Sequence, residues 1–432
     1  MRKTEAVAVG CGDRTTVYCE EGAHNLGLMK IVAAVDPDEV RLKYMRDRFG
    51  VPPQMCFKHI DDVLKMGKIA DCVINGTMDE LHKQTAIPFL RRGYDMLLEK
   101  PIVNNRQDLA EILAESERNK SKLMICHVLR YAPFYKKIKR LISDGEIGEI
   151  VNINTSERVG VFHSSVSYIR GKWNSEEKCG SSLLLAKCCH DIDLLCWLNN
   201  NTVPEYVYSE GGRNFIVPEK APEGAGTRCL VDCPEEVRRN CIFDVQSMYL
   251  DNCKLPWYPW QCTGKDWREV THEEKVDSLK TYNPHGACAY KIESDLADHQ
   301  QVTIRFANGS TANHTLLLAC MKAGRRIWVT GTRGELEGNA DDGKLYLRKY
   351  DKATSGYTEQ VFDFADTRGE TGGHFGGDKG LVQDFCALLR GEKPSVSCTA
   401  ISDSVNGHLA VYCADESLKT KRPVVFRKLE EI

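Results

Sequence analysis

The chain has 432 residues, of which 42% are hydrophobic and 28% are charged, and its formal net charge is -3. These values exclude a disordered chain and predict two domains, with neither a nucleic acid nor a membrane surface as partner. No apolar run approaches the roughly 18 residues of a membrane span, and no secretory signal is visible. Because the 19 cysteines are odd in number and scattered, we expect free thiols in a cytoplasmic protein.

The first predicted element is an apolar strand over residues 6–9, followed by a turn with two glycines and a helix to about residue 21. The first glycine permits a tight turn, the second lets a pyrophosphate approach the backbone, and the helix presents free N–H groups to the phosphates. Thr15 replaces the third glycine of G-x-G-x-x-G, which weakens the motif. The residues of this turn that we expect at a dinucleotide are Gly10, Cys11, Gly12, Asp13 and Arg14.

The second predicted strand, residues 30–35, ends at Asp36, at about the distance expected for an acid that binds ribose. A carboxylate there accepts hydrogen bonds from both ribose hydroxyls and repels a 2′-phosphate, so the pattern favours NAD over NADP as cofactor. The alternative is that Asp36 only caps the helix that starts at residues 37–38.

Strands and helices continue to alternate up to about residue 127. Such alternation predicts a parallel, doubly wound sheet, so residues 1–127 are assigned to an NAD-binding Rossmann domain. The further helices are expected at about residues 60–66, 79–92 and 106–120, and the further strands at 71–75, 95–98 and 122–126.

The tripeptide Glu99-Lys100-Pro101 directly follows the predicted strand at residues 95–98. Ligands of an open α/β sheet bind beyond the carboxyl ends of its strands. A lysine in that place can face a nicotinamide ring and a substrate oxygen together. The alternative is a surface lysine that precedes a turn-forming proline.

Between about residues 213 and 290 the composition shifts to proline and polar residues, and this insertion holds six of the 19 cysteines. Thiolates could hold a structural zinc that staples a segment with little apolar material of its own, or they are simply buried free thiols. The aromatic run Trp257-Tyr258-Pro259-Trp260 is a carbohydrate-stacking wall, an interface patch or local packing. The expected zinc ligands are Cys229, Cys233, Cys241 and Cys288.

Alternating segments after the insertion predict an antiparallel meander, with Asn308-Gly309 as a hairpin turn. A helix at about residues 378–389 is expected to pack back on this meander. The predicted strands of the meander are residues 301–306, 326–330, 334–338 and 344–347.

With these parts in order, the chain resembles the Gfo/Idh/MocA family of oxidoreductases. The resemblance implies an N-terminal Rossmann domain and, over residues 128–432, a C-terminal α/β domain whose large open antiparallel sheet covers the active site. It also implies NAD(P)-dependent chemistry at a hydroxyl or keto carbon of a sugar or cyclitol, in a homodimer or homotetramer. The matching segments are Gly10-Cys11-Gly12, Asp36, Gly76-Thr77-Met78-Asp79-Glu80-Leu81-His82, Glu99-Lys100-Pro101, Leu129-Arg130-Tyr131 and His190-Asp191-Ile192-Asp193-Leu194-Leu195.

The resemblance also implies roles for single residues. Lys100 contacts the substrate hydroxyl and the nicotinamide ribose, and His190 is the general base in oxidation. Many members carry an aspartate four residues before this histidine, where the present chain has Ala186. Our hypothesis is that Lys187, three residues before His190 and on the same helix face, replaces this aspartate with Asp191 or Asp193 nearby. The alternative is a solvated lysine. The other residues expected at the cofactor are Thr77, His82, Glu99 and Arg130, and those expected at the substrate are Tyr131, Trp173, Lys187, Asp191 and His374.

Three functions follow from this pattern. The first is an NAD-dependent dehydrogenase acting on a secondary hydroxyl of a sugar, glycoside or cyclitol. The second is an NAD-dependent glycosidase, because the segment Thr371-Gly372-Gly373-His374-Phe375-Gly376-Gly377-Asp378 is similar to the His-Gly-Gly stretch of that branch of the family. The third, suggested by Ala186, is a protein that binds NAD or sugar without catalysis.

Overall fold

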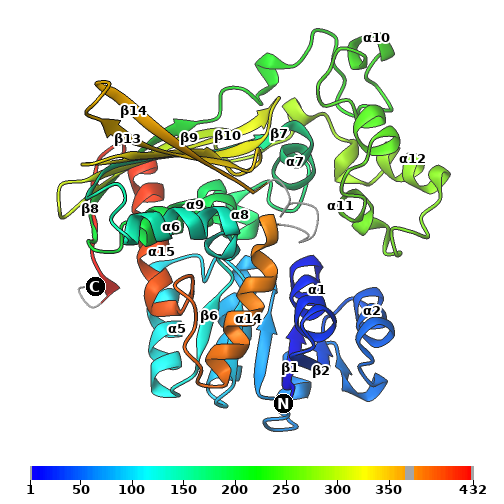
Figure 1. Ribbon diagram of the computed structural model, residues 1–432. Coiled ribbons are helices and arrows are strands. Elements are labelled where there is room, and N and C mark those ends of the chain that lie inside the picture. The colour runs from blue at the N-terminus through cyan, green and yellow to red at the C-terminus, as the bar shows by residue number, and fades with distance from the viewer. Residues whose placement is uncertain (1, 365–373, 430–432) are drawn as a thin grey trace.

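The computed structural model describes residues 2–364 and 374–429, and its two β-sheets lie one above the other in Figure 1. The lower sheet belongs to the N-terminal part of the chain and the upper sheet to the C-terminal part. Thr371, Gly372 and Gly373 fall outside the described residues, whereas His374 is within them. Among the described residues, no helix combines the length and the apolar character needed to cross a membrane.

The lower sheet is the predicted Rossmann sheet. Its strands are all parallel and lie in the order β3-β2-β1-β4-β5-β6, so the crossover from β1 to β4 creates the point at which ligands bind. Most residues of its central strands are buried, as expected for a sheet with helices on both faces. The strands are β1 (Thr4–Val9), β2 (Met29–Val35), β3 (Cys56–Phe57), β4 (Cys72–Asn75), β5 (Asp95–Leu98) and β6 (Leu123–Ile125).

The helices between these strands begin and end close to the predicted residues. The helix after β2 is capped by Asp38, whose side chain accepts a hydrogen bond from Val40 N, and it ends at Gly50 in the left-handed conformation. Asp38, and not Asp36, therefore caps this helix. The helices are α1 (Asp13–Glu20), α2 (Glu39–Phe49), α3 (Ile60–Leu64), α4 (His82–Leu90) and α5 (Arg106–Arg118).

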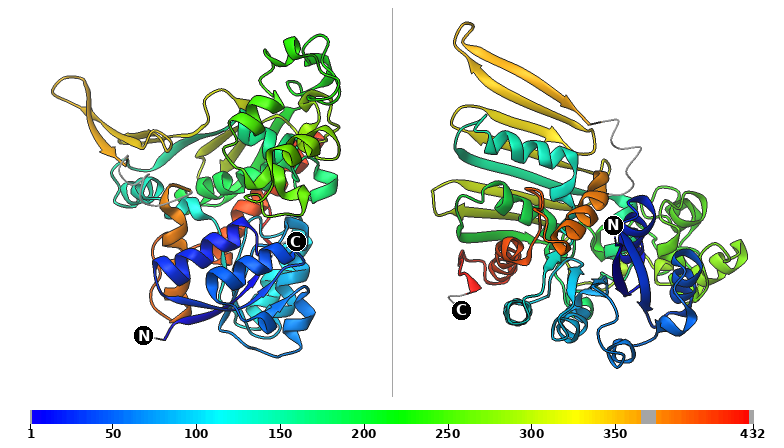
Figure 2. Two further views of the ribbon diagram at one scale, coloured as in Figure 1. Left: turned by 90° about the vertical axis from the view of Figure 1, so that its right-hand side faces the viewer. Right: turned by 60° about the horizontal axis from the view of Figure 1, so that its bottom comes forward.

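The upper sheet has nine described strands in the order β14-β13-β12-β11-β7-β10-β9-β8-β15. Only the β7–β10 pair is parallel, so the predicted large antiparallel sheet is confirmed as a mixed, mostly antiparallel one. Figure 2 shows the β13–β14 hairpin projecting beyond the rest of the domain. The strands are β7 (Ile150–Gly160), β8 (Pro204–Gly212), β9 (His299–Phe306), β10 (Thr311–Cys320), β11 (Gly324–Gly331), β12 (Glu335–Asn339), β13 (Lys344–Asp351), β14 (Gly356–Asp363) and β15 (Val424–Val425).

Helices cover one face of this sheet, between it and the Rossmann domain (Figure 1). Burial alternates along β9, with Gln300, Val302 and Ile304 turned inward, because successive side chains of a strand point to opposite faces. The opposite face is open and carries the exposed side chain of Trp328. The helices of this layer and its approaches are α6 (Pro133–Ser143), α7 (Val161–His163), α8 (Glu176–Cys179), α9 (Leu183–Leu198) and α15 (Ile401–Thr420).

The helix α14 (Gly377–Leu389) does not pack on the meander, so that prediction was wrong. Its apolar residues Leu381 and Phe385 share one buried cluster with Ala8 of β1 and Tyr18 of α1. The chain therefore returns to the Rossmann domain after the second sheet, because the face of the parallel sheet beside α1 needs an apolar cover. This return also brings His374 next to the carboxyl ends of the Rossmann strands.

The insertion runs between β8 and β9 and lies above α2 in Figure 1. Its residues Phe243, Tyr249, Trp260 and Leu279 are almost completely buried, and they share one apolar cluster with the second domain. Its helices are α10 (Glu235–Arg238), α11 (Trp257–Trp260) and α12 (His272–Lys280).

Candidate active site

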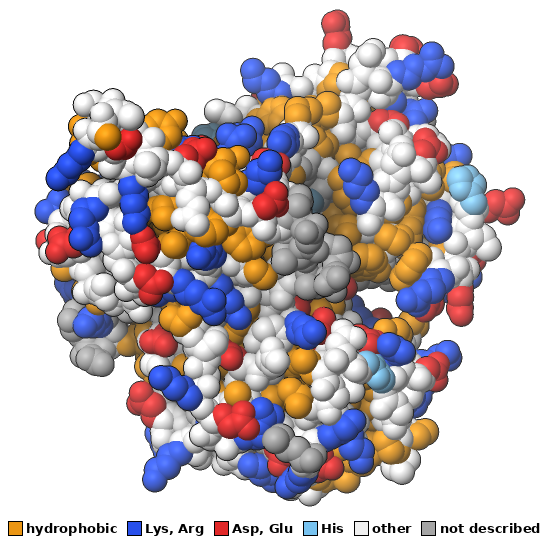
Figure 3. All heavy atoms as spheres, in the orientation of Figure 1, with side chains coloured by type: hydrophobic (Ala, Val, Ile, Leu, Met, Phe, Trp, Pro, Cys, Tyr) orange, Lys and Arg blue, Asp and Glu red, His pale blue; other side chains and the backbone are white. Residues whose placement is uncertain are grey.

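A cleft of about 450 Å³ runs along the carboxyl ends of the Rossmann strands, below the second domain and the insertion. Figure 3 shows a hollow between the insertion and the Rossmann domain under it. Most of the residues that the sequence predicts as functional border this cleft. They are Gly10, Gly12, Asp13, Arg14, Asp36, Thr77, Glu99, Lys100, Trp173, Lys187, His190 and His374.

The glycine turn after β1 has the form that a dinucleotide phosphate requires. Gly10 has φ +70°, and a Cβ on it would lie 2.7 Å from Thr77 N, so this position admits only glycine without strain. A Cβ on Gly12 would meet no described atom closer than Arg41 Nη1 at 4.0 Å, so space is open beside the backbone. The start of α1 has no side-chain cap, which leaves its N–H groups free for an anion.

Asp36 is buried at the end of β2 and is held in place by the backbone. Its carboxylate accepts hydrogen bonds from Cys11 N at 2.8 Å and from Asp38 N at 2.9 Å. Arg41 on α2 lies 3.3 Å from the same carboxylate and also borders the cleft. The fixed carboxylate, the free helix start and the glycine turn together fit the ribose and pyrophosphate of a dinucleotide.

A charged network ties the second domain to this end of the cleft. Arg14 donates to Glu99 at 3.3 Å and forms an ion pair with Asp378 of α14. Asp378 in turn lies 3.4 Å from Nδ1 of His374. Because Glu99 also accepts a hydrogen bond from Lys100 N at 2.8 Å, the network fixes the segment that carries Lys100.

Lys100 connects β5 to the helix that carries the candidate base. Its Nζ donates a 2.8 Å hydrogen bond to the carbonyl oxygen of Ala186 in α9. The amine therefore bonds to the backbone of the residue where family members often carry an aspartate. Further N–H groups of the amine remain available to a ligand in the cleft.

His190 lies on α9, one turn beyond Ala186, and is 5% exposed. Burial lowers the pKa of His190 well below its usual range, and the charge of Lys100 and the neighbouring imidazoles lower it further. Its Nδ1 has no hydrogen-bond partner among the described residues. The rings of His127 and His374 lie 5.5 and 6.2 Å from its ring, measured between centroids. A neutral imidazole with a free nitrogen is suited to accept a proton.

Lys187 borders the cleft but forms an ion pair away from the candidate base. Its Nζ lies 3.1 Å from Glu157 on β7, and Glu157 also pairs with Arg325 at 3.0 Å. Besides burial, the charges of Lys100 and Arg325 and the neighbouring imidazoles lower the pKa of His190. In this arrangement Lys187 neutralises Glu157.

Five predicted residues lie outside the lining of the cleft. Arg130 is buried and pairs with Asp193 through a 2.7 Å hydrogen bond, which leaves it facing the interior of the second domain. His82 is buried and bridges two loops that border the cleft, with Nδ1 2.7 Å from Pro101 O and Nε2 3.2 Å from Thr77 O. The other three are Cys11, Tyr131 and Asp191, all of them buried.

A second cavity of about 870 Å³ adjoins the cleft and shares Lys187, Arg325 and His374 with it.

Neither Arg325 nor Arg41 is predicted from the sequence as a residue of the site. Arg325 lies on β11, where its side chain reaches Asp191 at 3.0 Å, and only the pairing of β11 with β7 brings it there. Arg41 could have been suspected because it follows Asp36 within the same helix-start segment.

The four candidate zinc ligands of the insertion are not assembled. No three of the sulfur atoms of Cys229, Cys233, Cys241 and Cys288, all of which are described, lie within 4.8 Å of one another. Tetrahedral zinc needs Zn–S distances of about 2.3 Å, and so sulfur atoms in mutual contact. The structure therefore does not provide the predicted zinc site, and these thiols are free.

One other group among the described residues has ligand atoms within 4.8 Å, namely Cys188, Asp191 and His314. Its carboxylate is already paired with Arg325 at 3.0 Å. A divalent cation there would lie beside a guanidinium, which disfavours metal binding.

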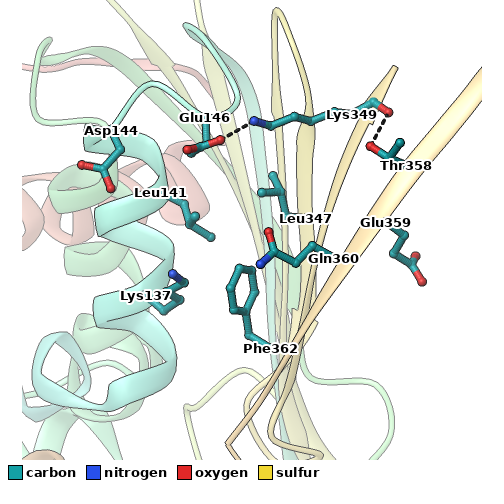
Figure 4. Close-up of a pocket in the computed structure, with 10 residues that line it drawn as sticks. All are labelled: Lys137, Leu141, Asp144, Glu146, Leu347, Lys349, Thr358, Glu359, Gln360 and Phe362. Carbon is teal, nitrogen blue, oxygen red and sulfur yellow. Dashed lines mark hydrogen bonds and ion pairs between the residues drawn. The ribbon is translucent and has the colours of Figure 1, made fainter. Parts of the chain in front are cut away.

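A separate hollow of about 390 Å³ lies between α6 and the β13–β14 hairpin (Figure 4). Glu146 and Lys349 form an ion pair across it, and Leu347 and Phe362 line its floor. It shares no lining residue with the cleft, so the predicted functional residues point to the cleft alone.

Comparison with known proteins agrees with this geometry. Residues 5–127 match the family described as "Oxidoreductase family, NAD-binding Rossmann fold", and residues 139–425 match "Oxidoreductase family, C-terminal alpha/beta domain". YteT of Bacillus subtilis, named as an oxidoreductase, is 24% identical over 422 residues, which are 93% of this chain and 92% of YteT. Inositol 2-dehydrogenase of Corynebacterium glutamicum is 24% identical over 183 residues, which cover 42% of this chain and 48% of that enzyme.

Among solved structures, the WlbA dehydrogenase of Bordetella pertussis in complex with NADH and UDP-GlcNAcA has a similar fold. The TM-score is 0.68 and the sequence identity 14%, and the match covers 99% of both chains. At this identity the likeness concerns the fold only.

Proposed function

The chain belongs to the Gfo/Idh/MocA oxidoreductase family, and we propose that it is an NAD-dependent dehydrogenase acting on a secondary hydroxyl or keto group of a sugar, glycoside or cyclitol. The observation that carries the proposal is that Gly10, Asp36, Lys100 and His190 border one cleft. A cleft that joins a ribose-binding carboxylate to an amine and a neutral imidazole suits a reaction between a dinucleotide and a hydroxyl group.

Two features support the substrate class. The family relatives include an inositol 2-dehydrogenase and a dehydrogenase solved with a sugar nucleotide. Within the cleft, the ring of Trp173 lies beside Tyr168, and the Lys172 amine lies 4.3 Å from the Trp173 ring centre. Aromatic faces of this kind bind the apolar face of a sugar or cyclitol ring.

Oxidation of a CH–OH group breaks a C–H and an O–H bond. Bound NAD supplies the acceptor for the hydride. We assign the proton of the hydroxyl to His190, because burial and the Lys100 charge keep this imidazole neutral and the residue borders the cleft. Lys100 donates a hydrogen bond to the oxygen as negative charge develops on it, while its bond to Ala186 fixes the amine. In the reducing direction His190 returns the proton.

The test mixes the protein with NAD and a panel of polyols, sugars and aryl glycosides while NADH absorbance and aglycone release are followed. Accumulation of NADH supports a dehydrogenase. His190→Asn is expected to lower kcat by about 100- to 10,000-fold, the usual contribution of a general base, with NAD affinity retained. His59→Asn, at an exposed position outside the cleft, is the matched control. If His190→Asn turns over like the wild type, the assignment of the base is wrong.

A second candidate is the NAD-dependent glycosidase, and the position of His374 favours it. His374 borders the cleft within 6.2 Å of the His190 ring, so the site offers two imidazoles for proton transfer. Elimination of an aglycone needs one group to remove a proton and another to protonate the leaving oxygen. Aglycone release without net NADH would select this function. NAD binding with neither product would select the non-catalytic alternative.

We further propose that the protein is a homodimer or homotetramer assembled through the open face of the upper sheet. That face exposes Trp328 of β11, Tyr206 of β8, and Tyr357 and Val361 of β14. Exposed aromatic residues on a flat sheet face favour association with a second copy.

We also propose a cytoplasmic location for the protein. All 19 cysteines are free thiols, as expected in a reducing compartment.

A further inference from the structure

The segment around α11 of the insertion reaches the cofactor end of the cleft. Leu255, Trp257 and Tyr258 border the same cavity as Gly10 and Asp36, although more than 200 positions separate them in the sequence. Figure 1 shows α11 on the side of the molecule that carries α1 and α2. The cleft is therefore bounded by the glycine turn on one side and by the insertion on the other.

Tyr258 lies where the helix α1 begins. Burial and, to a smaller extent, the charge of Asp13 raise the pKa of Tyr258 to about 12, while the charge of Arg14 opposes them. Asp13 and Arg14 are the first residues of α1, whose N–H groups carry no side-chain cap. The phenol of Tyr258 thus shares the charged surroundings of the helix start that suits a pyrophosphate.

Trp257 has a donor without an acceptor. Its indole N–H is buried and has no hydrogen-bond partner among the described residues. A buried donor left unpaired costs free energy, and an indole nitrogen can only donate. An anionic oxygen or a ribose hydroxyl in the cleft would satisfy this donor.

The insertion is also in electrostatic reach of α2, the helix that follows Asp36. Burial raises the pKa of Tyr44 on α2, and the charge of Arg268 of the insertion opposes this rise. The insertion therefore comes close to the Rossmann domain at two points, at α11 and at Arg268. Two regions of proximity fix the insertion beside the dinucleotide site more firmly than one.

We propose that the segment Leu255–Tyr258 is a third part of the dinucleotide site, in which Tyr258 and Trp257 donate to the phosphate and ribose oxygens and slow the release of the cofactor. The inference rests on NAD binding by the proposed function but not on the identity of its substrate. A cofactor that leaves slowly suits a reaction in which the same dinucleotide is reduced and reoxidised before it dissociates.

The test measures release of NADH from the full chain without substrate, by the loss of NADH fluorescence after addition of excess NAD. Tyr258→Phe and Trp257→Phe each remove one donor and keep an aromatic ring, so both are expected to fold. Each should release NADH about 10- to 100-fold faster, the effect of losing a hydrogen bond to a charged group. Tyr282→Phe, at a 59% exposed position of the same insertion, is the matched control and should release NADH at the wild-type rate.

Two outcomes overturn the inference. If both Phe variants release NADH at the wild-type rate while the KM for the substrate rises, the segment Leu255–Tyr258 contacts the substrate and is not part of the cofactor site. If the wild type binds no NADH at all, the proposed function fails together with this inference. Thermal unfolding of each variant without NADH separates loss of the fold from loss of a contact.

Discussion

The carboxyl edge of the Rossmann sheet and the second domain border the same cleft, but their residues reach it by different routes. At the Rossmann edge, Gly10, Asp36 and Lys100 each lie within two residues of the end of a strand, so their position along the chain determines their position in space. In the second domain, Arg325, His374 and Trp257 come from a strand, a helix start and an insertion. Nothing local marks these three as neighbours.

A sequence motif therefore locates a functional residue reliably at the edge of the parallel sheet, but not in the second domain. Parallel strands of a doubly wound sheet end at one edge, so any polar residue that follows such a strand is near the ligand site. Beyond residue 127 this rule no longer applies, and proximity to a motif in sequence has little value. Arg130, Lys187 and the cysteines of the insertion are the residues on which that contrast can be tested.

The largest effect is expected at Arg130. Arg130→Met leaves Asp193 buried without its partner, and removing one member of a buried ion pair costs about 3–5 kcal/mol of stability. The midpoint of urea unfolding should fall accordingly, whereas NAD affinity of the folded variant should not change. Replacing both partners, as in Arg130→Met with Asp193→Leu, should recover part of the loss. Arg140→Met, at an exposed position on α6, is the control. A variant of normal stability with weaker NAD binding would return Arg130 to the cofactor site.

A smaller effect is expected at Lys187. Lys187→Met removes one partner of Glu157 and leaves Arg325, so we expect a loss of about 1–3 kcal/mol in stability. The pH dependence of kcat/KM should not move, because burial and Lys100 set the low pKa of His190. In wild type and variant alike, activity should hold as the pH falls to about 6.5, the ordinary histidine pKa, and decline only below it as His190 becomes protonated. Lys178→Met on α8 is the control. A shifted acid limb would support the original hypothesis that Lys187 assists His190.

The smallest effect is expected from metal removal. Because the sulfur atoms of Cys229, Cys233, Cys241 and Cys288 are not assembled, treatment with a chelator should leave both the metal content and the thermal unfolding of the protein unchanged. Loss of one zinc per chain together with a lower unfolding temperature would contradict the structure. Addition of zinc after chelation is the control for damage by the chelator itself.

The predicted fold class is confirmed, and the reason is local. The runs at residues 6–9, 30–35 and 95–98 could be identified as strands because each is short, apolar and bounded by polar or glycine residues. The helix at residues 377–389 was predicted with nearly correct bounds but on the wrong partner. Amphipathic spacing reveals that a helix has an apolar face, but not which surface that face will cover.

The residue pattern alone is enough to predict the Rossmann sheet, the position of Asp36 after β2 and that of Lys100 after β5, because strand order and strand ends suffice to locate them. Three contacts follow from the three-dimensional packing alone: Lys100 bonds to Ala186, Arg130 pairs with Asp193, and the insertion borders the cleft beside Gly10 and Asp36. These contacts join segments between 63 and more than 200 positions apart. They depend on how whole layers pack, and no local pattern of residues encodes that packing.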